Sequence, residues 1–364
     1  MDNNSEKIKI EDLGYNLFFE SNRNQLKLGG FSVARVIAEF KESYKVKNAD
    51  GEYLAKITGK QMFEASGRED YPAVGDWVAI TELDKDSAVI RGVLPRLTII
   101  KRKSGSKTQI IATNIDTAFI VESVDRDYNL NRFERYFAIA KSGGVKPAII
   151  LNKIDMLSQQ ELEGKLAQLR NRFSDIDIVS TSIKTDEGLN ELKSYLVKGK
   201  TYCFLGSSGV GKSSLINKLL GEGLIKTGKI SSYSGRGKHV TTGRQMYFLE
   251  NGGIVIDNPG MREVGMADSS QGVDIFFDEI TALAQRCKFT DCTHAHEPGC
   301  AVLQAVKSGS LDGEKHSNYL NLKKEADFYE MSEVEKREKD RRFGKFIKKA
   351  KKELKDSGHK NFKY

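Results

Sequence analysis

The fold of this chain is decided by residues 201–220, which read TYCFLGSSGVGKSSLINKLL. The apolar run 201–205 predicts a buried strand, and residues 214–220 predict a helix. Between them stands the pattern G-x-x-x-x-G-K-S, in which closely spaced backbone N–H groups at the start of a helix surround phosphates. We expect the Lys212 ammonium to reach the β and γ phosphates and the Ser213 hydroxyl to bind Mg²⁺. The predicted phosphate-binding loop comprises Gly206, Ser207, Ser208, Gly209, Val210, Gly211, Lys212, Ser213 and Ser214.

A second motif, Asn152-Lys153-Ile154-Asp155, precedes this loop in the chain. It follows the predicted strand 148–151, and the carboxyl ends of strands are where open α/β sheets bind ligands. The pattern N-K-x-D indicates guanine, because the Asp155 carboxylate can accept both N–H groups of the guanine edge, which adenine does not offer. We expect Asn152 and Lys153 to brace this loop against the base and the phosphate loop.

Two weaker elements follow in the matching order. Ser182-Ile183-Lys184 is similar to a loop whose backbone amide contacts the guanine carbonyl, although the tripeptide alone has little specificity. After the apolar run 253–256 comes D-x-P-G, in which Asp257 is expected to hold Mg²⁺ through water and Gly260 to offer an N–H to the γ-phosphate. Because guanine recognition precedes phosphate recognition, the sequence predicts a circularly permuted GTPase, with the γ-phosphate-responsive segment leading directly into the C-terminal region.

That C-terminal region contains a candidate metal site. Three of the four cysteines fall between residues 287 and 300, in the pattern C-x4-C-x-H-x5-C. Three thiolates and one imidazole are the ligand set of a closed, tetrahedral structural Zn²⁺ site. We therefore expect one structural zinc ion, with His296 as a competing ligand and with free thiols beside surface histidines as the alternative. The expected ligands are Cys287, Cys292, His294 and Cys300.

Over roughly residues 28–330, this set of motifs resembles the RsgA (YjeQ) family of circularly permuted GTPases, which act in late assembly of the bacterial small ribosomal subunit. The resemblance implies an N-terminal OB-fold barrel, a permuted GTPase domain and a C-terminal zinc domain. It also implies small-subunit rRNA, GTP and GDP as partners, with Mg²⁺ bound alongside GTP.

The resemblance further suggests a catalytic residue within residues 236–242, RGKHVTT, which are similar to the family pattern R-G-[RK]-H-T-T-T. A threonine here would complete Mg²⁺ coordination, and because Val240 replaces the first one, Thr241 and Thr242 both stay candidates. Met261 follows D-x-P-G where Ras-type enzymes have a glutamine that orients water. The resemblance therefore points to His239 for that role, and a solvent-facing loop histidine is the alternative.

The residues also support the implied architecture. Short β-rich runs separated by turn signals recur between residues 30 and 103, which suits a five-stranded barrel of the OB or SH3-like type. We expect Trp77 to belong to the barrel core rather than to serve as a base-stacking platform. The predicted fold class is multidomain α/β. The predicted divisions are an extension (1–27), the barrel (28–103), the permuted GTPase domain (104–275), a helical zinc domain (276–330) and a basic helix or tail (331–364).

Charge suggests the partner. The net charge is +8, and residues 331–364 alone hold 13 basic and 6 acidic residues. The basic residues are interspersed with Phe343, Phe346 and Ile347, which predicts a basic amphipathic helix that binds RNA phosphates. A solvated charged helix and a membrane-surface helix are the alternatives. The lack of a long apolar run or a signal peptide favours a cytoplasmic protein without a membrane partner. We also expect a monomer.

Two other functions remain open from the sequence. One is an RNA-binding assembly chaperone in which GTP is only an occupancy signal, and the other is a permuted GTPase acting on the large subunit or at a membrane.

Overall fold

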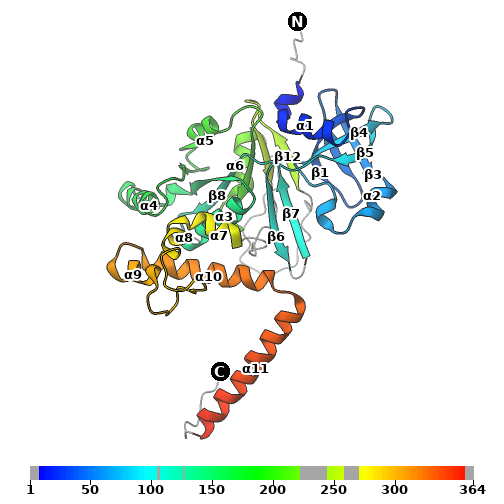
Figure 1. The fold of residues 1–364 in the computed structure, drawn as a ribbon. Coiled ribbons are helices and arrows are strands. Elements are labelled where there is room, and N and C mark those ends of the chain that lie inside the picture. The colour runs from blue at the N-terminus through cyan, green and yellow to red at the C-terminus, as the bar shows by residue number, and fades with distance from the viewer. Residues whose placement is uncertain (1–7, 105–106, 126–127, 222–243, 258–269, 357–364) are drawn as a thin grey trace.

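The computed structural model describes residues 8–104, 107–125, 128–221, 244–257 and 270–356. Within these ranges eleven strands form one sheet in the order β10-β9-β8-β11-β13-β12-β1-β2-β3-β5-β4. The first six strands of this order form an α/β unit, and the last five form a barrel (Figure 1).

The α/β unit is built on a largely parallel sheet. Because helices cover both faces, its central strands are continuous apolar runs rather than alternating ones. Its parallel strands are β8 (Thr117–Ser123), β9 (Lys146–Asn152), β10 (Ile178–Thr181), β11 (Thr201–Leu205) and β13 (Ile254–Asp257), and β12 (Gln245–Phe248) pairs antiparallel with β13.

The helices divide between the two faces of this sheet. α3 (Leu130–Ser142) and α4 (Gln159–Arg172) contribute to one apolar core, whereas α5 (Leu189–Tyr195) and α6 (Lys212–Leu220) contribute to the other. The short 3-10 helix η3 (Ile154–Met156) follows β9. The chain therefore changes face between the helix after β8 and the helix after β11, which opens a crevice at the carboxyl ends of these adjacent strands.

The predicted five-stranded barrel is confirmed. Pairing of β1 with β4 closes it, and the apolar interior includes Val36, Val46 and Ile80. Between β3 and β4 lie α2 (Gly59–Glu64) and the 3-10 helix η2 (Arg68–Asp70). The barrel strands are β1 (Ser32–Glu39), β2 (Tyr44–Lys47), β3 (Glu52–Ile57), β4 (Trp77–Glu82) and β5 (Ser87–Val93).

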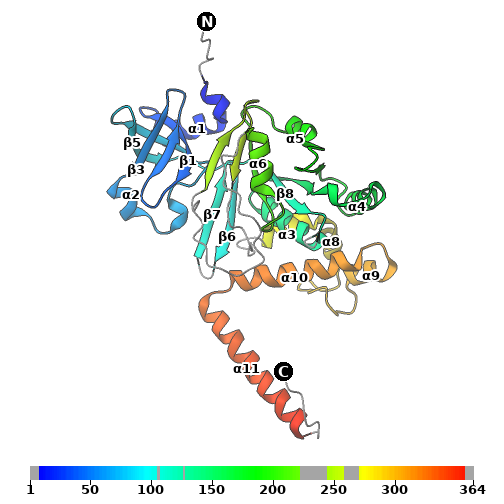
Figure 2. The ribbon, with the colours of Figure 1, turned by 180° about the vertical axis from the view of Figure 1, so that it is seen from behind.

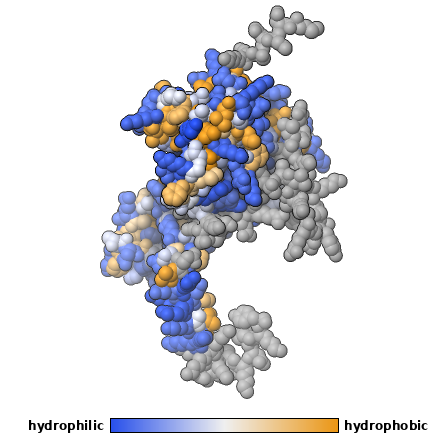
Figure 3. All heavy atoms as spheres, turned by 90° about the vertical axis from the view of Figure 1, so that its right-hand side faces the viewer, coloured by the Kyte–Doolittle hydropathy of each residue, from blue (hydrophilic) through white to orange (hydrophobic). Residues whose placement is uncertain are grey.

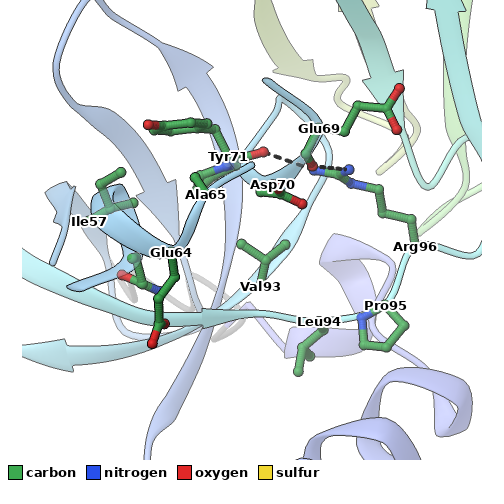
Figure 4. Close-up of a pocket in the computed structure, with 12 residues that line it drawn as sticks. Ile57, Glu64, Ala65, Glu69, Asp70, Tyr71, Val93, Leu94, Pro95 and Arg96 are labelled. Carbon is green, nitrogen blue, oxygen red and sulfur yellow. Dashed lines mark hydrogen bonds between the residues drawn. The ribbon is translucent and has the colours of Figure 1, made fainter. Parts of the chain in front are cut away.

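A pocket of about 410 Å³ lies on this barrel between α2 and the end of β5, lined by residues that include Ile57, Glu64 and Val93 (Figure 4). At its edge Arg96 donates to the Tyr71 carbonyl at 2.9 Å and pairs with the buried Asp76 at 2.7 Å. The residues that line the pocket all belong to the segment 57–96, so the pocket is separate from the nucleotide motifs.

The N-terminal extension packs on the barrel. It forms the 3-10 helix η1 (Ile10–Leu13) and α1 (Leu17–Gln25), and the rings of Tyr15 and Phe19 contact Trp77 at centroid distances of 4.8 and 5.9 Å. Trp77 is fully buried, as predicted, but it lies between the extension and the barrel rather than in the barrel interior.

A separate two-stranded hairpin, β6 (Ile99–Ser104) and β7 (Lys107–Thr113), follows the barrel. It lies between the barrel and the α/β sheet in both ribbon views (Figures 1 and 2). The predicted division between residues 103 and 104 falls inside this hairpin.

The C-terminal region is helical. α7 (Ser270–Phe276) packs on α3, and α8 (Asp278–Ala284) follows it. After the cysteine-rich loop come α9 (Ala301–Ser308), α10 (Gly313–Glu330) and α11 (Glu333–Asp356). The last of these, α11, extends away from the rest of the molecule (Figures 1 and 2). No helix within the described ranges is long and apolar enough to cross a membrane.

Candidate nucleotide site and metal centre

The phosphate-loop motif follows β11 at the sheet crevice. The phosphate loop contains three glycines with φ values of 142° (Gly206), 90° (Gly209) and 102° (Gly211). Residues that carry a Cβ rarely adopt such positive φ values. A Cβ at Gly206 would also clash with the Val121 carbonyl oxygen of β8, and one at Gly211 would clash with the Asn152 side chain. The glycines therefore permit both the loop conformation and its close approach to the neighbouring strands.

The loop leads directly into α6. Val210 is buried in the apolar core beneath this helix, Ser208 and Gly209 are exposed, and Ser207 is half-buried. Gly211 is the N-cap of α6, so Lys212, Ser213 and Ser214 occupy the first turn. The backbone N–H groups of this turn lack partners within the helix, which makes them available to an anion.

Lys212 is held against its own loop. Its Nζ donates to the carbonyl oxygens of Gly206 at 2.7 Å and Ser207 at 2.6 Å. Burial lowers the pKa of Lys212 to about 8, although the negative charges of Asp257 and Glu122 oppose this shift. Asp257 is buried at the end of β13, and its negative charge acts on the Lys212 ammonium.

Asn152 joins the two halves of the site. Its side chain is fully buried, its Nδ2 donates to the Val210 carbonyl at 2.7 Å, and its Oδ1 accepts from the Thr181 hydroxyl at 3.0 Å. The N-K-x-D loop is thereby tied to the phosphate loop, which follows it by 58 positions. The sequence alone did not identify Thr181, since this residue belongs to no motif and reaches Asn152 only through the pairing of β10 with β9.

Lys153 takes the left-handed backbone conformation, with φ of 64°. Its Nζ pairs with the Asp125 carboxylate at 2.9 Å, and that carboxylate also accepts from the Ser123 hydroxyl at 2.7 Å. The sequence analysis did not identify Asp125, because only the parallel pairing of β8 with β9 brings residue 125 beside residue 153.

The other residues predicted for base recognition also lie together. Ser182 donates its hydroxyl to Asp155 Oδ1 at 2.7 Å and accepts from the backbone N–H groups of Lys184 and Thr185, each at 3.2 Å. The Lys184 Nζ lies 3.7 Å from Asp155 Oδ2. Ile183 packs at the edge of the core beside Gly211. The residues predicted for the base and the phosphates therefore share one crevice.

Several predicted residues lie outside the described ranges. The segments 222–243 and 258–269 include His239, Val240, Thr241 and Thr242, and also Gly260 and Met261.

The cysteine-rich loop between α8 and α9 brings four candidate metal ligands together. The ligand atoms of Cys287, Cys292, His294 and Cys300 all lie within 4.8 Å of one another, so they could hold one metal ion. The Cys287 and Cys300 sulfurs are 3.8 Å apart, and His294 Nδ1 lies 3.6 and 3.5 Å from them. Burial lowers the pKa of His294, which favours the neutral imidazole that a metal requires.

The surrounding helices hold this cluster in place. Cys300 is the N-cap of α9, and its Sγ accepts from the Leu303 N–H at 3.4 Å. From α10, the buried His316 ring contacts the His294 carbonyl oxygen through Nε2 at 3.0 Å. His316 carries no motif, and the sequence alone could not place it here.

The chain is similar to known proteins over most of its length. A family model described as RsgA GTPase matches residues 93–267. The chain is 37% identical over 359 residues to small ribosomal subunit biogenesis GTPase RsgA 1 of Bacteroides thetaiotaomicron, covering 97% of this chain and 99% of that protein. It is 44% identical over 261 residues to small ribosomal subunit biogenesis GTPase RsgA of Methanosarcina acetivorans, covering 71% and 70% of the two chains.

Solved structures agree with the fold. The crystal structure of YjeQ from Thermotoga maritima matches with a TM-score of 0.62 and 27% identity, over 80% of this chain and 97% of that one. YloQ, described as a circularly permuted GTPase, matches with a TM-score of 0.59 and 21% identity, over 83% of this chain and 97% of YloQ. The predicted fold class is therefore confirmed.

Proposed function

The chain belongs to the RsgA GTPase family, and on that premise we propose that it binds the small ribosomal subunit and hydrolyses GTP to GDP during late subunit assembly. One contact carries the proposal most directly, namely the 2.7 Å hydrogen bond from Asn152 to the Val210 carbonyl. It joins a loop that selects a base to a loop that holds phosphates, and a nucleotide needs both.

In this proposal Asp155 reads the base. Its carboxylate accepts the two N–H groups on the guanine edge, while Ser182 fixes the carboxylate through the 2.7 Å hydrogen bond. The backbone of Ser182, Ile183 and Lys184 faces the guanine carbonyl, and Lys153 is oriented by Asp125. Asn152 acts as a brace, since both of its side-chain hydrogen bonds are to the protein.

The loop from Gly206 to Ser214 holds the phosphates. The ammonium of Lys212 now donates to two loop carbonyls, and phosphate oxygens would replace these acceptors when a nucleotide binds. Ser213 and Asp257 would hold Mg²⁺, which neutralises charge on the β and γ phosphates. Thr241 or Thr242 would complete its coordination, and Gly260 would donate its N–H to the γ-phosphate.

His239 is proposed to orient the attacking water, because Met261 cannot. A thioether is only a weak acceptor, so it cannot replace the glutamine of Ras-type enzymes. Slow intrinsic hydrolysis and strong stimulation by the small subunit follow from this assignment. Full subunit-stimulated hydrolysis by His239→Ala would exclude His239 from this role.

The Cys3His cluster is proposed to hold one structural Zn²⁺. With Zn–S bonds of about 2.3 Å and tetrahedral angles, two ligand sulfurs should lie about 3.8 Å apart. The 3.8 Å between Cys287 and Cys300 supports this choice. Metal analysis of the purified protein should find about one zinc per chain, and Cys300→Ser should reduce that content. Retention of the full zinc content in the variant would count against Cys300 as a ligand.

We propose that the barrel, the zinc module and the basic α11 contact rRNA while the GTPase domain times release. We further propose that the protein acts in the cytoplasm as a monomer.

The decisive experiment measures GTP hydrolysis by the purified protein with small subunits, with large subunits and without either. Selective stimulation by small subunits is the expected result. Stimulation only by large subunits would reassign the partner. Binding to small subunits without stimulation would instead favour an assembly chaperone that uses GTP as an occupancy signal.

A further inference from the structure

The helix α11 exposes aromatic side chains within its basic surface. Phe343 and Phe346 are each 64% exposed. Figure 3 shows α11 as a hydrophilic surface with separate hydrophobic spots. Single exposed apolar side chains are common, but two exposed phenylalanines close together within a basic surface can mark a site of interaction.

The charge around the two rings identifies the chemistry of that partner. Residues 341–352 hold seven basic residues and no acidic residue. A helix of 24 residues is about 36 Å long, which is sufficient to follow several phosphates of a polyanion. The first turns of α11 contact the end of α10, because the ammonium groups of Lys336 and Lys339 each lie 5.5 Å from the centroid of the Phe328 ring.

The spacing places cations directly beside the rings. Residues three or four apart are neighbours on a helix surface, so Phe343 lies next to Phe346, and Phe346 lies between Arg342 and Lys349. Phe343, Phe346 and Ile347 lie on one face of α11, so this helix is amphipathic, as a membrane-surface helix also is. Aromatic platforms bordered by cations are instead typical of surfaces that bind single-stranded nucleic acid.

We propose that α11 binds RNA with unpaired bases, with Phe343 and Phe346 as stacking platforms and the flanking cations on the backbone phosphates. A fully paired A-form duplex has a narrow major groove and no accessible base faces, so it would engage the cations but leave both rings in water. Unpaired bases can stack on the rings. This inference rests on the proposed function and adds the class of RNA that the C-terminal helix recognises.

The test compares RNA binding by full-length variants. Fluorescence anisotropy would measure the affinity for a short single-stranded RNA and for a perfectly paired duplex of the same length. Both measurements would use the same salt concentration. Phe343→Leu and Phe346→Leu keep an apolar side chain but remove the ring. Each should reduce single-strand affinity about fivefold or more, while duplex affinity changes less than about twofold. The ring-preserving controls Phe343→Tyr and Phe346→Tyr should retain single-strand binding within about twofold.

Two outcomes would overturn the inference. Wild-type single-strand affinity in both leucine variants would indicate that the side chains serve an apolar protein groove or a bilayer, for which leucine suffices. Equal losses for single-stranded and duplex RNA would show that the rings do not distinguish them. Both positions are exposed, and melting temperatures would verify that the variants fold. Stimulation of wild-type GTP hydrolysis by small subunits tests the proposed function independently, so the inference can fail while that function stands.

Discussion

Replacing Asn152 by alanine should separate the two loops of the nucleotide site. The substitution removes the hydrogen bond to the Val210 carbonyl at 2.7 Å and the hydrogen bond from the Thr181 hydroxyl at 3.0 Å. Asn152 is fully buried, so water cannot easily replace either partner. The side chain contacts both β10 and the phosphate loop, and alanine can contact neither in the same way.

The magnitude follows from the groups left without partners. The Val210 carbonyl and the Thr181 hydroxyl each lose a partner at a cost of about 1–3 kcal/mol, so Asn152→Ala should lower the free energy of unfolding by about 2–6 kcal/mol. The phosphate loop would also lose its connection to the base-recognition loop. A loss of about 1.4 kcal/mol in positioning corresponds to about tenfold weaker GDP binding.

Calorimetric titration with GDP and with IDP, together with urea unfolding, measures both effects. Asn152→Ala should weaken GDP and IDP binding by the same factor, since Asn152 braces the loops rather than reading the base. Asp155→Asn should instead weaken GDP more than IDP, which lacks the exocyclic amino group. Thr181→Val is the matched control, because it removes only the Thr181 bond and should therefore change GDP affinity less than Asn152→Ala does.

The reasoning would be refuted if Asn152→Ala bound GDP within about twofold of wild type and unfolded within about 0.5 kcal/mol of it. A loss confined to GDP, with IDP binding unchanged, would show that Asn152 reads the base directly.

Three further predictions concern buried charges. Burial lowers the pKa of Lys212 to about 8, and bound phosphates favour its ammonium form. GDP affinity should therefore be constant below about pH 7 and should fall as pH rises through 8, by up to about tenfold per pH unit. A GDP affinity that stays constant up to about pH 9 would contradict this. Glu134→Gln should destabilise the fold by about 1.5–3 kcal/mol in urea unfolding, because it removes the charge that pairs with Arg172 at 2.7 Å while Asp312 still pairs with Arg172 at 2.8 Å. A cost below about 0.5 kcal/mol would contradict this. Arg35→Met removes a buried guanidinium that donates to the Leu13 and Asn114 carbonyls. Limited proteolysis should therefore release the N-terminal extension sooner than in wild type. Equal rates of release would show that Arg35 does not hold the extension in place.

The sequence was sufficient where function requires a short contiguous motif. Gly206, Gly211 and Lys212 predicted a phosphate loop. Glycine permits the backbone conformation of the loop, and lysine supplies its positive charge. The strand before the loop and the helix after it were predicted from apolar periodicity and are present as β11 and α6. The order of the motifs predicted the permuted topology, which the strand order confirms.

Long-range partners were not readable in this way. Asp125, Thr181 and His316 support the predicted residues from other strands and helices, and no local pattern identifies them. Trp77 was expected in the barrel core, but it lies in the core between the barrel and the N-terminal extension, whose packing the sequence does not indicate. The hairpin β6–β7 crosses the predicted division at residue 103 because its hydrogen bonds depend on pairing rather than on composition.

The chain by itself therefore determined which groups are available for the proposed guanine, phosphate, metal and polyanion sites, since each site needs particular side chains at fixed spacing. The tertiary structure alone decided which groups meet, because strand pairing and helix packing bring together residues that lie far apart in the chain. Asn152 and Val210 illustrate the difference, since their motifs are evident in the sequence and their 2.7 Å contact exists only in the folded sheet.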